Sequence, residues 1–395
     1  MIAVRTPQLR AWTPAVAVGP LAKPLAQLAM LAAIGVELAV LAAYLPDTLD
    51  HGWNGPTSDF HNLYVRARGL ELMGLYSPAL TLLLYPLARL PEMPAFRVFF
   101  ALNAAALLGV ACLAQRPFSA PAARVAVALA VISLPQAHWA LRLGHLTPML
   151  ALAALGGLVL AQRHPGRAAA VLAFLSIKPQ YAAAPFLLLL WRKQGRPALM
   201  MLGLSAVMAI AGFAVIGLSS VGTFFSLATD WGATSSDNLL PVQQSWLYSW
   251  PGVQISLGME PNPLLTADLI LLSLGATVVA WVRGTPQAGA AAAALAMIPL
   301  APYAQFYDGA LLVAGLALIV RAGLRPALQW GLFGGLYLAA LATQANTIFP
   351  APDLLADAHT DGIFWLTPAM AGAIALIALA GRSRGASFVE DADGG

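Results

Sequence analysis

Long apolar runs separated by short polar stretches set the pattern of this chain. The first run extends from Leu25 to Leu45, and others follow at 95–115, 122–141, 147–162, 168–190, 199–218, 264–282, 288–301, 308–320, 327–343 and 363–380. A helix needs roughly 20 predominantly apolar residues to cross a bilayer, and several runs approach that length. The pattern therefore predicts an all-α polytopic membrane protein with roughly 11–13 transmembrane helices, including short broken ones.

The composition agrees with this prediction. The chain is 59% hydrophobic and 10% charged, with a mean hydropathy of +0.75, whereas soluble domains have roughly a quarter charged residues. The net charge is only +4, and the basic residues stand in short clusters between apolar runs. Such clusters indicate membrane topology, so we expect membrane lipids around the protein and no nucleic acid partner.

Basic residues near the N-terminus predict the orientation of the first helix. Arg5, Arg10 and Lys23 precede the run that begins at Leu25, and basic flanks tend to stay in the cytoplasm. We expect a cytoplasmic segment at 1–24, a transmembrane domain at 25–381 and a disordered cytoplasmic tail at 382–395. The outer loops of that domain are expected at 46–94, 219–263 and 344–362.

Two segments leave the topology open. Leu80 to Leu90 is apolar but has about half the length that a span requires, so it either crosses the membrane or lies along the outer interface with Tyr76 and Tyr85 as head-group anchors. The run 168–190 is interrupted by Lys178-Pro179. We favour a hairpin of two short helices with Lys178 at its outer tip, because proline breaks a helix and a lysine at membrane depth is costly.

The polar loop after the first run contains the first candidate chemistry. It has Asp59 at its centre, followed by His61, Tyr64 and Arg66. Taken alone, Asp59 could simply cap the helix that follows. Arg66, Arg142 and Lys178 fall on the predicted outer side, where cations are unusual. They would meet lipid head groups there or bind the phosphate of a lipid-borne substrate.

Several catalytic motifs are missing. The sequence has no HExxH or CxxC metal-binding spacing, no Walker A loop and no GxGxxG. These absences argue against a zincin-type metalloprotease, an ATP-driven pump and a nicotinamide enzyme. We therefore expect no metal and no cofactor.

A series of short motifs resembles glycosyltransferase family 87. The series comprises Ser58-Asp59-Phe60, Tyr76-Ser77-Pro78, Gly144-His145-Leu146-Thr147, Lys178-Pro179-Gln180, and Pro302-Tyr303 with Tyr307-Asp308. The resemblance implies a GT-C-type bundle in a bacterial-type inner membrane, with extracytoplasmic loops forming the site and a polyprenyl-phosphate sugar as donor. It also implies that Asp59 is the catalytic aspartate and that Lys178 contacts the donor phosphate.

Two motifs depart from the family pattern. The family usually shows Gly-Gln-x-Asn where this chain has Gly144-His145-Leu146-Thr147, so a titratable group replaces an amide. The Trp-x-His-His pattern of actinobacterial members is missing after the later turn, where this chain has Gln305-Phe306-Tyr307-Asp308. We expect the replacement of the amide by His145 to affect which donor or acceptor the protein prefers.

The resulting hypothesis is an inverting transfer of a mannose-like or arabinose-like sugar to a lipid or glycan hydroxyl. Asp59 would act as general base, and Lys178, Arg66 and Arg142 would stabilise the departing phosphate. A transporter or flippase of a lipid-linked sugar is the alternative, because broken helices with a charge at the break also occur in transporters. The residues expected to bind substrate are His61, Tyr64, His145, Gln180, Tyr303, Tyr307 and Asp308.

Overall fold

The structure is a computed structural model that describes residues 22–51, 59–73, 76–226, 247–348 and 365–380. These residues form helices and connecting turns, and their β-pairing is an isolated antiparallel bridge between Leu247 and Gln305. The fold class of an all-α polytopic membrane protein is confirmed. The expected tail at 382–395, most of the segment at 1–24 and much of the loops at 219–263 and 344–362 lie outside the described residues.

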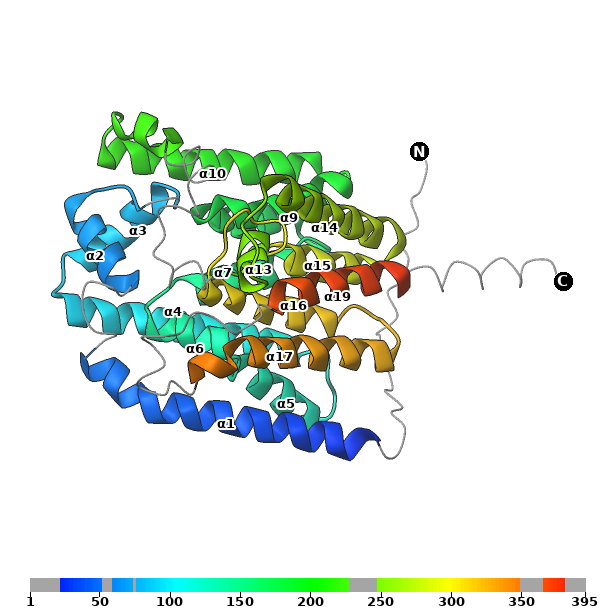
Figure 1. Ribbon diagram of the computed structural model, residues 1–395. Helices are drawn as coiled ribbons and strands as arrows, with labels where there is room; N and C mark the ends of the chain where they lie inside the picture. Colours follow the sequence, from blue (N-terminus) through cyan, green and yellow to red (C-terminus); the bar gives the residue numbers. More distant parts are fainter. Residues whose placement is uncertain (1–21, 52–58, 74–75, 227–246, 349–364, 381–395) are drawn as a thin grey trace.

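The helices lie side by side in one bundle (Figure 1). In the first half they are α1 (Ala22–His51), α2 (Asp59–Gly69), α3 (Ala79–Ala88), α4 (Glu92–Gln115), α5 (Pro121–Ile132), α6 (Pro135–Arg142), α7 (Thr147–Leu160), α8 (Pro165–Ala173), η2 (Phe174–Ile177) and α9 (Pro179–Trp191). In the second half they are α10 (Gly195–Ile216), α13 (Trp250–Ser256), α14 (Pro263–Arg283), α15 (Pro286–Ala296), η3 (Phe306–Leu311), α16 (Leu312–Ile319), α17 (Pro326–Ile348) and α19 (Leu366–Ala380).

Few of the apolar helices are long. Within the described ranges α4, α10 and α14 are long and apolar enough to cross a membrane. Helices α5 and α6 reach that length only together, as a broken span or a re-entrant loop bent by 49°. The apolar helices α3, α7 and α19 are shorter, as are α8 with η2 and η3 with α16. The expected short and broken helices are therefore present.

Proline marks where many helices begin. Pro121, Pro135, Pro179 and Pro286 each occupy the first turn of their helix. The first N–H groups of a helix lack partners inside it, and proline has no N–H and a fixed φ that suits this position. The sequence thus divides the apolar runs into short helices at defined points.

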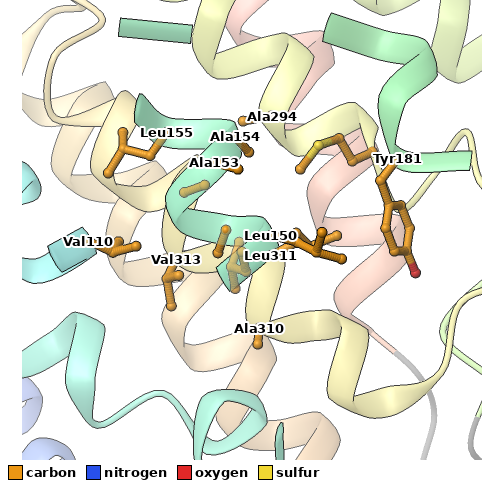
Figure 2. Close-up of a cluster of buried hydrophobic side chains, with 14 of the residues drawn as sticks. Val110, Leu150, Ala153, Ala154, Leu155, Tyr181, Ala294, Ala310, Leu311 and Val313 are labelled. Atoms are coloured by element: carbon orange, nitrogen blue, oxygen red, sulfur yellow. The ribbon is translucent and has the colours of Figure 1, made fainter. Parts of the chain in front are cut away.

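The centre of the bundle is made of small side chains. Residues 288–296 of α15 are all buried, and most of them are alanine. Gly315 of α16 allows α15 to approach closely, because a Cβ there would lie 2.5 Å from the Leu295 side chain. Figure 2 shows Ala294 of α15 near Ala153 and Ala154 of α7. Small residues at helix contacts are typical of membrane bundles.

The outer helices have the opposite character. Leu199 of α10 is 69% exposed, and Leu264 and Leu272 of α14 are 78% and 69% exposed. Large apolar side chains on the outside of a bundle are stable when they face lipid tails instead of water. These surfaces agree with the membrane assignment.

The chain forms the expected hairpin at 168–190. The Gln194 side chain after α9 donates to the carbonyl of Ala161 before α8, at 3.1 Å. The hairpin therefore leaves one end of the bundle and returns to it, with Lys178 at its tip. Lys178 has φ −115° and ψ 91°, an extended geometry that the following proline favours. This prediction is confirmed.

The two ends of the bundle differ in charge. We name one the basic end, formed by Ala161–Arg167, Trp191–Arg196, Gly284–Pro286 and Arg321–Arg325. Two hydrogen bonds join these segments. Arg192 donates to the Pro286 carbonyl, and Thr285 Oγ1 donates to the Ala322 carbonyl at 3.0 Å. The opposite end, at the hairpin tip, is the site end. There the Ser77 amide donates to the Ile177 carbonyl at 2.8 Å.

Helix α3 resolves the other open segment. It has 10 residues, which gives a length of about 15 Å, half of the hydrocarbon thickness. It packs against α2 and α10 at the site end. A helix this short does not cross a bilayer, so the interpretation in which Leu80 to Leu90 stays on one side is the one the structure supports.

Candidate active site

Helix α2 docks on the loop between α6 and α7. The Phe60 amide donates to the Leu143 carbonyl at 3.0 Å. Gly144 follows with φ +66°, and a Cβ there would lie 2.5 Å from the Cβ of Phe60. Glycine adopts this left-handed backbone without steric cost. The Gly144 turn thus lets the start of α2, with Asp59, approach His145.

Lys178 makes a buried ion pair at the hairpin tip. Its Nζ lies 2.7 Å from Oδ1 of Asp308, and the side chains are 6% and 0% exposed. The rings of Tyr76, Tyr181 and Tyr307 surround the ammonium at 4.9, 5.6 and 5.2 Å from their centroids. Aromatic faces attract a cation electrostatically. The ammonium is therefore held by one carboxylate and three rings.

Both oxygens of the Asp308 carboxylate have partners. Oδ1 accepts from Lys178 and from Thr147 Oγ1, the latter at 3.2 Å. Oδ2 accepts from the main-chain amide of Gln305 at 3.0 Å, which fixes the turn that begins η3. A buried carboxylate with three donors is well compensated for its burial. Asp308 therefore has a structural part in this site.

A chain of hydrogen bonds links Tyr76 to Asp308. His145 lies 2.5 Å from the Tyr76 hydroxyl through Nε2 and 2.5 Å from Thr147 Oγ1 through Nδ1. Burial, and then the charge of Lys178, lower the pKa of His145 well below its usual value, so the imidazole is neutral at pH 7. A neutral imidazole has one donor and one acceptor nitrogen.

Thr147 holds one side of the His145 ring. Its Oγ1 donates to Asp308 and lies against Nδ1 of His145, and its main-chain amide also donates to Nδ1 at 3.3 Å. Nε2 lies against the Tyr76 hydroxyl on the other side. The His145 ring also stacks on Tyr307, with centroids 3.9 Å apart, so the imidazole is fixed in position on its face and at both nitrogens.

Asp59 differs from Asp308 in its environment. The residue is partly exposed, but its Oδ2 is buried and has no hydrogen-bond partner among the described residues. Burial raises the pKa of Asp59 from 3.8 to about 7, and the charge of Asp308 adds to the rise. The charge of Lys178 and a hydrogen bond with Tyr307 oppose it. Asp59 therefore titrates near neutral pH.

The two carboxyl groups thus have different chemical capacities. Asp308 is occupied by Lys178, Thr147 and the Gln305 amide. Asp59 lies close enough to Lys178 and Asp308 for their charges to alter its pKa, yet one of its oxygens is free. A general base needs a lone pair that is free to take a proton and a pKa near the working pH. Asp59 has an oxygen without a partner and a pKa of about 7.

Three residues predicted from the α2 loop lie outside this cluster. His61 Nδ1 is 2.7 Å from Glu92 Oε1, and the Tyr64 hydroxyl donates to the Leu90 carbonyl at 2.8 Å. Arg66 is exposed and donates to the Leu72 carbonyl at 2.9 Å. All three connect α2 with the segments before and after α3.

The other predicted residues lie around the cluster. Tyr303 alters the pKa of Tyr76, and its own pKa is raised above the usual value by burial, then by Asp308 and Asp59. Gln180 Nε2 reaches the Tyr303 carbonyl at 3.5 Å. Arg142 stacks on Trp139, with its guanidinium 5.3 Å from the ring centroid.

Sequence reasoning missed some members of the cluster. Tyr76 was expected as a head-group anchor, but its hydroxyl binds His145 and its ring faces Lys178; a tyrosine at a predicted interface gives no sign of such inward contacts. Thr147 is the last residue of the Gly144-His145-Leu146-Thr147 motif but was given no role, and Tyr181 directly follows Lys178-Pro179-Gln180. Their places in or next to these motifs were the available signal. No group of three or more His, Cys, Asp or Glu that could hold a metal ion occurs in the described ranges.

One of the comparisons with known proteins identifies the family. A model of glycosyltransferase family 87 matches residues 75–302, which is more than half of the chain. The matched region contains Tyr76, His145 and Lys178; Asp59 precedes it and Asp308 follows it. No curated protein and no solved structure matches. Family 87 comprises GT-C-type membrane glycosyltransferases, and the length of the match shows that this chain belongs to glycosyltransferase family 87.

Proposed function

We propose that this glycosyltransferase moves a mannose-like or arabinose-like sugar from a polyprenyl-phosphate donor to a hydroxyl of a lipid or glycan acceptor. The observation that supports this most is the contrast between the two carboxyl groups. Asp59 keeps a buried oxygen without a partner beside the ammonium of Lys178, whereas Asp308 is fully bonded. Such a pair suits a reaction that removes a proton and releases an anion.

The proposed step is a single displacement. The acceptor oxygen attacks the anomeric carbon of the sugar while Asp59 takes the hydroxyl proton. The bond between the anomeric carbon and the phosphate oxygen breaks, and its electrons leave with the polyprenyl phosphate as a dianion. Attack from the face opposite the phosphate inverts the anomeric centre. The proton remains on Asp59 until it passes to solvent.

Lys178 is the cation best placed to stabilise the phosphate. Its charge acts inside a buried site, where electrostatic stabilisation is stronger than in water. Its aromatic surroundings and Asp308 hold the ammonium in one place. Arg142, beside Trp139, is a second candidate. Arg66 has less support, because its guanidinium binds the Leu72 carbonyl.

We infer an extracytoplasmic position for the site from the charge of the opposite end. Arg163, Arg167, Arg192, Lys193 and Arg196 gather at the basic end, and the hairpin joins them there. Loops rich in Arg and Lys stay in the cytoplasm. With the N-terminus also cytoplasmic, the site end would face outward from a bacterial-type inner membrane.

Transfer from defined donors tests the proposal. Purified protein would be incubated with polyprenyl-phosphate mannose, arabinose, glucose or galactose and with membrane lipid extract as acceptor. We expect a new glycosylated product with one donor, and no product with Asp59→Asn. Asp268→Asn is the matched control, because Asp268 is an exposed carboxylate on α14.

The same assay separates the alternative function. A flippase would move the intact donor across a vesicle membrane without breaking the sugar–phosphate bond. Donor that changes leaflet and remains chemically unchanged with every acceptor would contradict the transferase proposal. An Asp59→Asn variant that retains full transfer would contradict the assignment of the base.

A further inference from the structure

A cavity opens at the basic end, far from the cluster around Lys178. It has a volume of about 440 Å³. Its walls come from the end of α14, the start of α15, the turn before α17, and the end of α19. Nothing in the proposed transfer reaction uses this cavity.

Two arginines line the cavity. Arg283 is the last residue of α14, and Arg325 directly precedes α17. Both are exposed, and neither guanidinium makes a hydrogen bond or ion pair with another described residue. Two guanidinium groups on one cavity suit an anion with several oxygens, because each presents a fork of N–H donors.

The remaining wall is mostly apolar. Leu328 of α17 and Leu376, Ile377 and Leu379 of α19 line it. The neighbouring outer surface is apolar as well, since Val282 is 57% exposed. An inorganic anion gains nothing from such walls, whereas an acyl chain removes their surface from water. The cavity therefore combines the two surfaces that an amphiphile with an anionic head requires.

The shape of the cavity is fixed by hydrogen bonds. Thr285 Oγ1 accepts from the Ala288 amide at 3.1 Å and donates to the Ala322 carbonyl at 3.0 Å. Gly323 follows with φ +65°, which makes the turn toward Arg325. These contacts join α15 to the turn before α17, so the two walls are held together before any ligand arrives.

We propose that this cavity binds one anionic phospholipid. Arg283 and Arg325 contact its phosphate, and one acyl chain lies along Leu328, Leu376 and Leu379. Basic pockets between transmembrane helices bind anionic lipid head groups. The proposal concerns the end of the bundle opposite the glycosyltransferase site, and it holds or fails independently of the sugar donor.

Native mass spectrometry of the delipidated full-length protein tests this site. Dioleoyl phosphatidylglycerol, dioleoyl phosphatidylcholine and inorganic phosphate would be titrated separately. We expect one tightly bound phosphatidylglycerol, and weaker binding of phosphatidylcholine. In the Arg283→Gln, Arg325→Gln double variant the affinity for phosphatidylglycerol should fall roughly 30-fold, as the loss of two surface cations predicts.

Two further variants make the result specific. Arg163→Gln, Arg167→Gln removes the same charge from exposed positions of the basic end that do not line the cavity, and it should bind phosphatidylglycerol as the wild type does. Leu376→Trp fills the apolar part and should weaken the lipid while both arginines remain. Equal loss in both double variants, equal affinity for the two lipids, or tight binding of inorganic phosphate that Leu376→Trp leaves unchanged would each overturn the proposal.

Discussion

Replacing Asp59 by asparagine should abolish transfer and at the same time stabilise the fold. The carboxyl group has a pKa of about 7 in the folded protein against 3.8 when unperturbed. Keeping it ionised above neutral pH therefore costs up to roughly 4 kcal/mol of folding free energy. Asparagine has a similar shape and no charge, so it avoids this cost. It also cannot accept the proton, and loss of a general base lowers turnover by roughly 10²–10⁴-fold.

The sign of the pH dependence follows from the raised pKa. Below about pH 4 the group is protonated in both the folded and unfolded states, and the two proteins should melt alike. As the pH rises from about 4 to about 7, the wild type loses stability that the Asn variant keeps. We therefore expect the melting temperature of Asp59→Asn in one detergent to exceed that of the wild type by an amount that grows up to about pH 7 and is then constant.

The pH dependence of wild-type activity should follow the ionisation of Asp59. The ionised fraction of a carboxyl with a pKa of about 7 rises from about 9% at pH 6 to about 91% at pH 8, so kcat/KM should rise about tenfold. Radiolabelled sugar transfer across this range measures it, with Asp268→Asn as control. A flat profile, or an Asn variant that melts below the wild type at pH 8, would refute the assignment of Asp59 as an uncompensated base.

Three further perturbations test the surroundings of this base. Gly144→Ala should lower transfer and stability together, because the left-handed backbone alone costs an alanine about 1–2 kcal/mol; activity equal to wild type would show that the close approach is unnecessary. Lys178→Met should cost about 3–5 kcal/mol in thermal unfolding by isolating the buried Asp308, and adding Asp308→Leu should restore stability but not activity. His145→Gln keeps polar groups that can bond the Tyr76 hydroxyl and Thr147, so it should keep more activity than His145→Ala; equal losses would contradict the positioning of Tyr76 by this residue.

The sequence was most informative where covalent geometry dictates the backbone. Lys178-Pro179 interrupts an apolar run, and proline excludes a continuous helix there. The hairpin and the position of Lys178 at its tip followed from that restriction. The short length of Leu80 to Leu90 left two interpretations open, and the 10 residues of α3 favour the one that stays on one side.

The partners within the site could not be predicted in the same way. Asp59 and Asp308 look alike in sequence, since each stands at the start of a helix. Their difference depends on contacts with Lys178 and Thr147, which are distant along the chain. Nearness to Asp59 in sequence also did not place His61, Tyr64 and Arg66 in the cluster around Lys178. His61 lies about 200° around α2 from Asp59, and Arg66 lies about 10 Å further along its axis.

The roles assigned to these residues remain predictions. The family match covers the region of Lys178 and His145 but begins after Asp59. The sugar, the acceptor and the phosphate contacts depend on molecules outside the chain, and the transfer assays above address them directly.

The close approach of α10 to the start of α3 has a consequence for the Tyr76 segment. A Cβ on Gly212 of α10 would lie 2.3 Å from the Pro78 carbonyl carbon. Ser77, next to Pro78, donates to the Ile177 carbonyl at the hairpin tip. A larger residue at position 212 would therefore push on the segment that carries Tyr76, although α10 contributes no side chain to the cluster around Lys178.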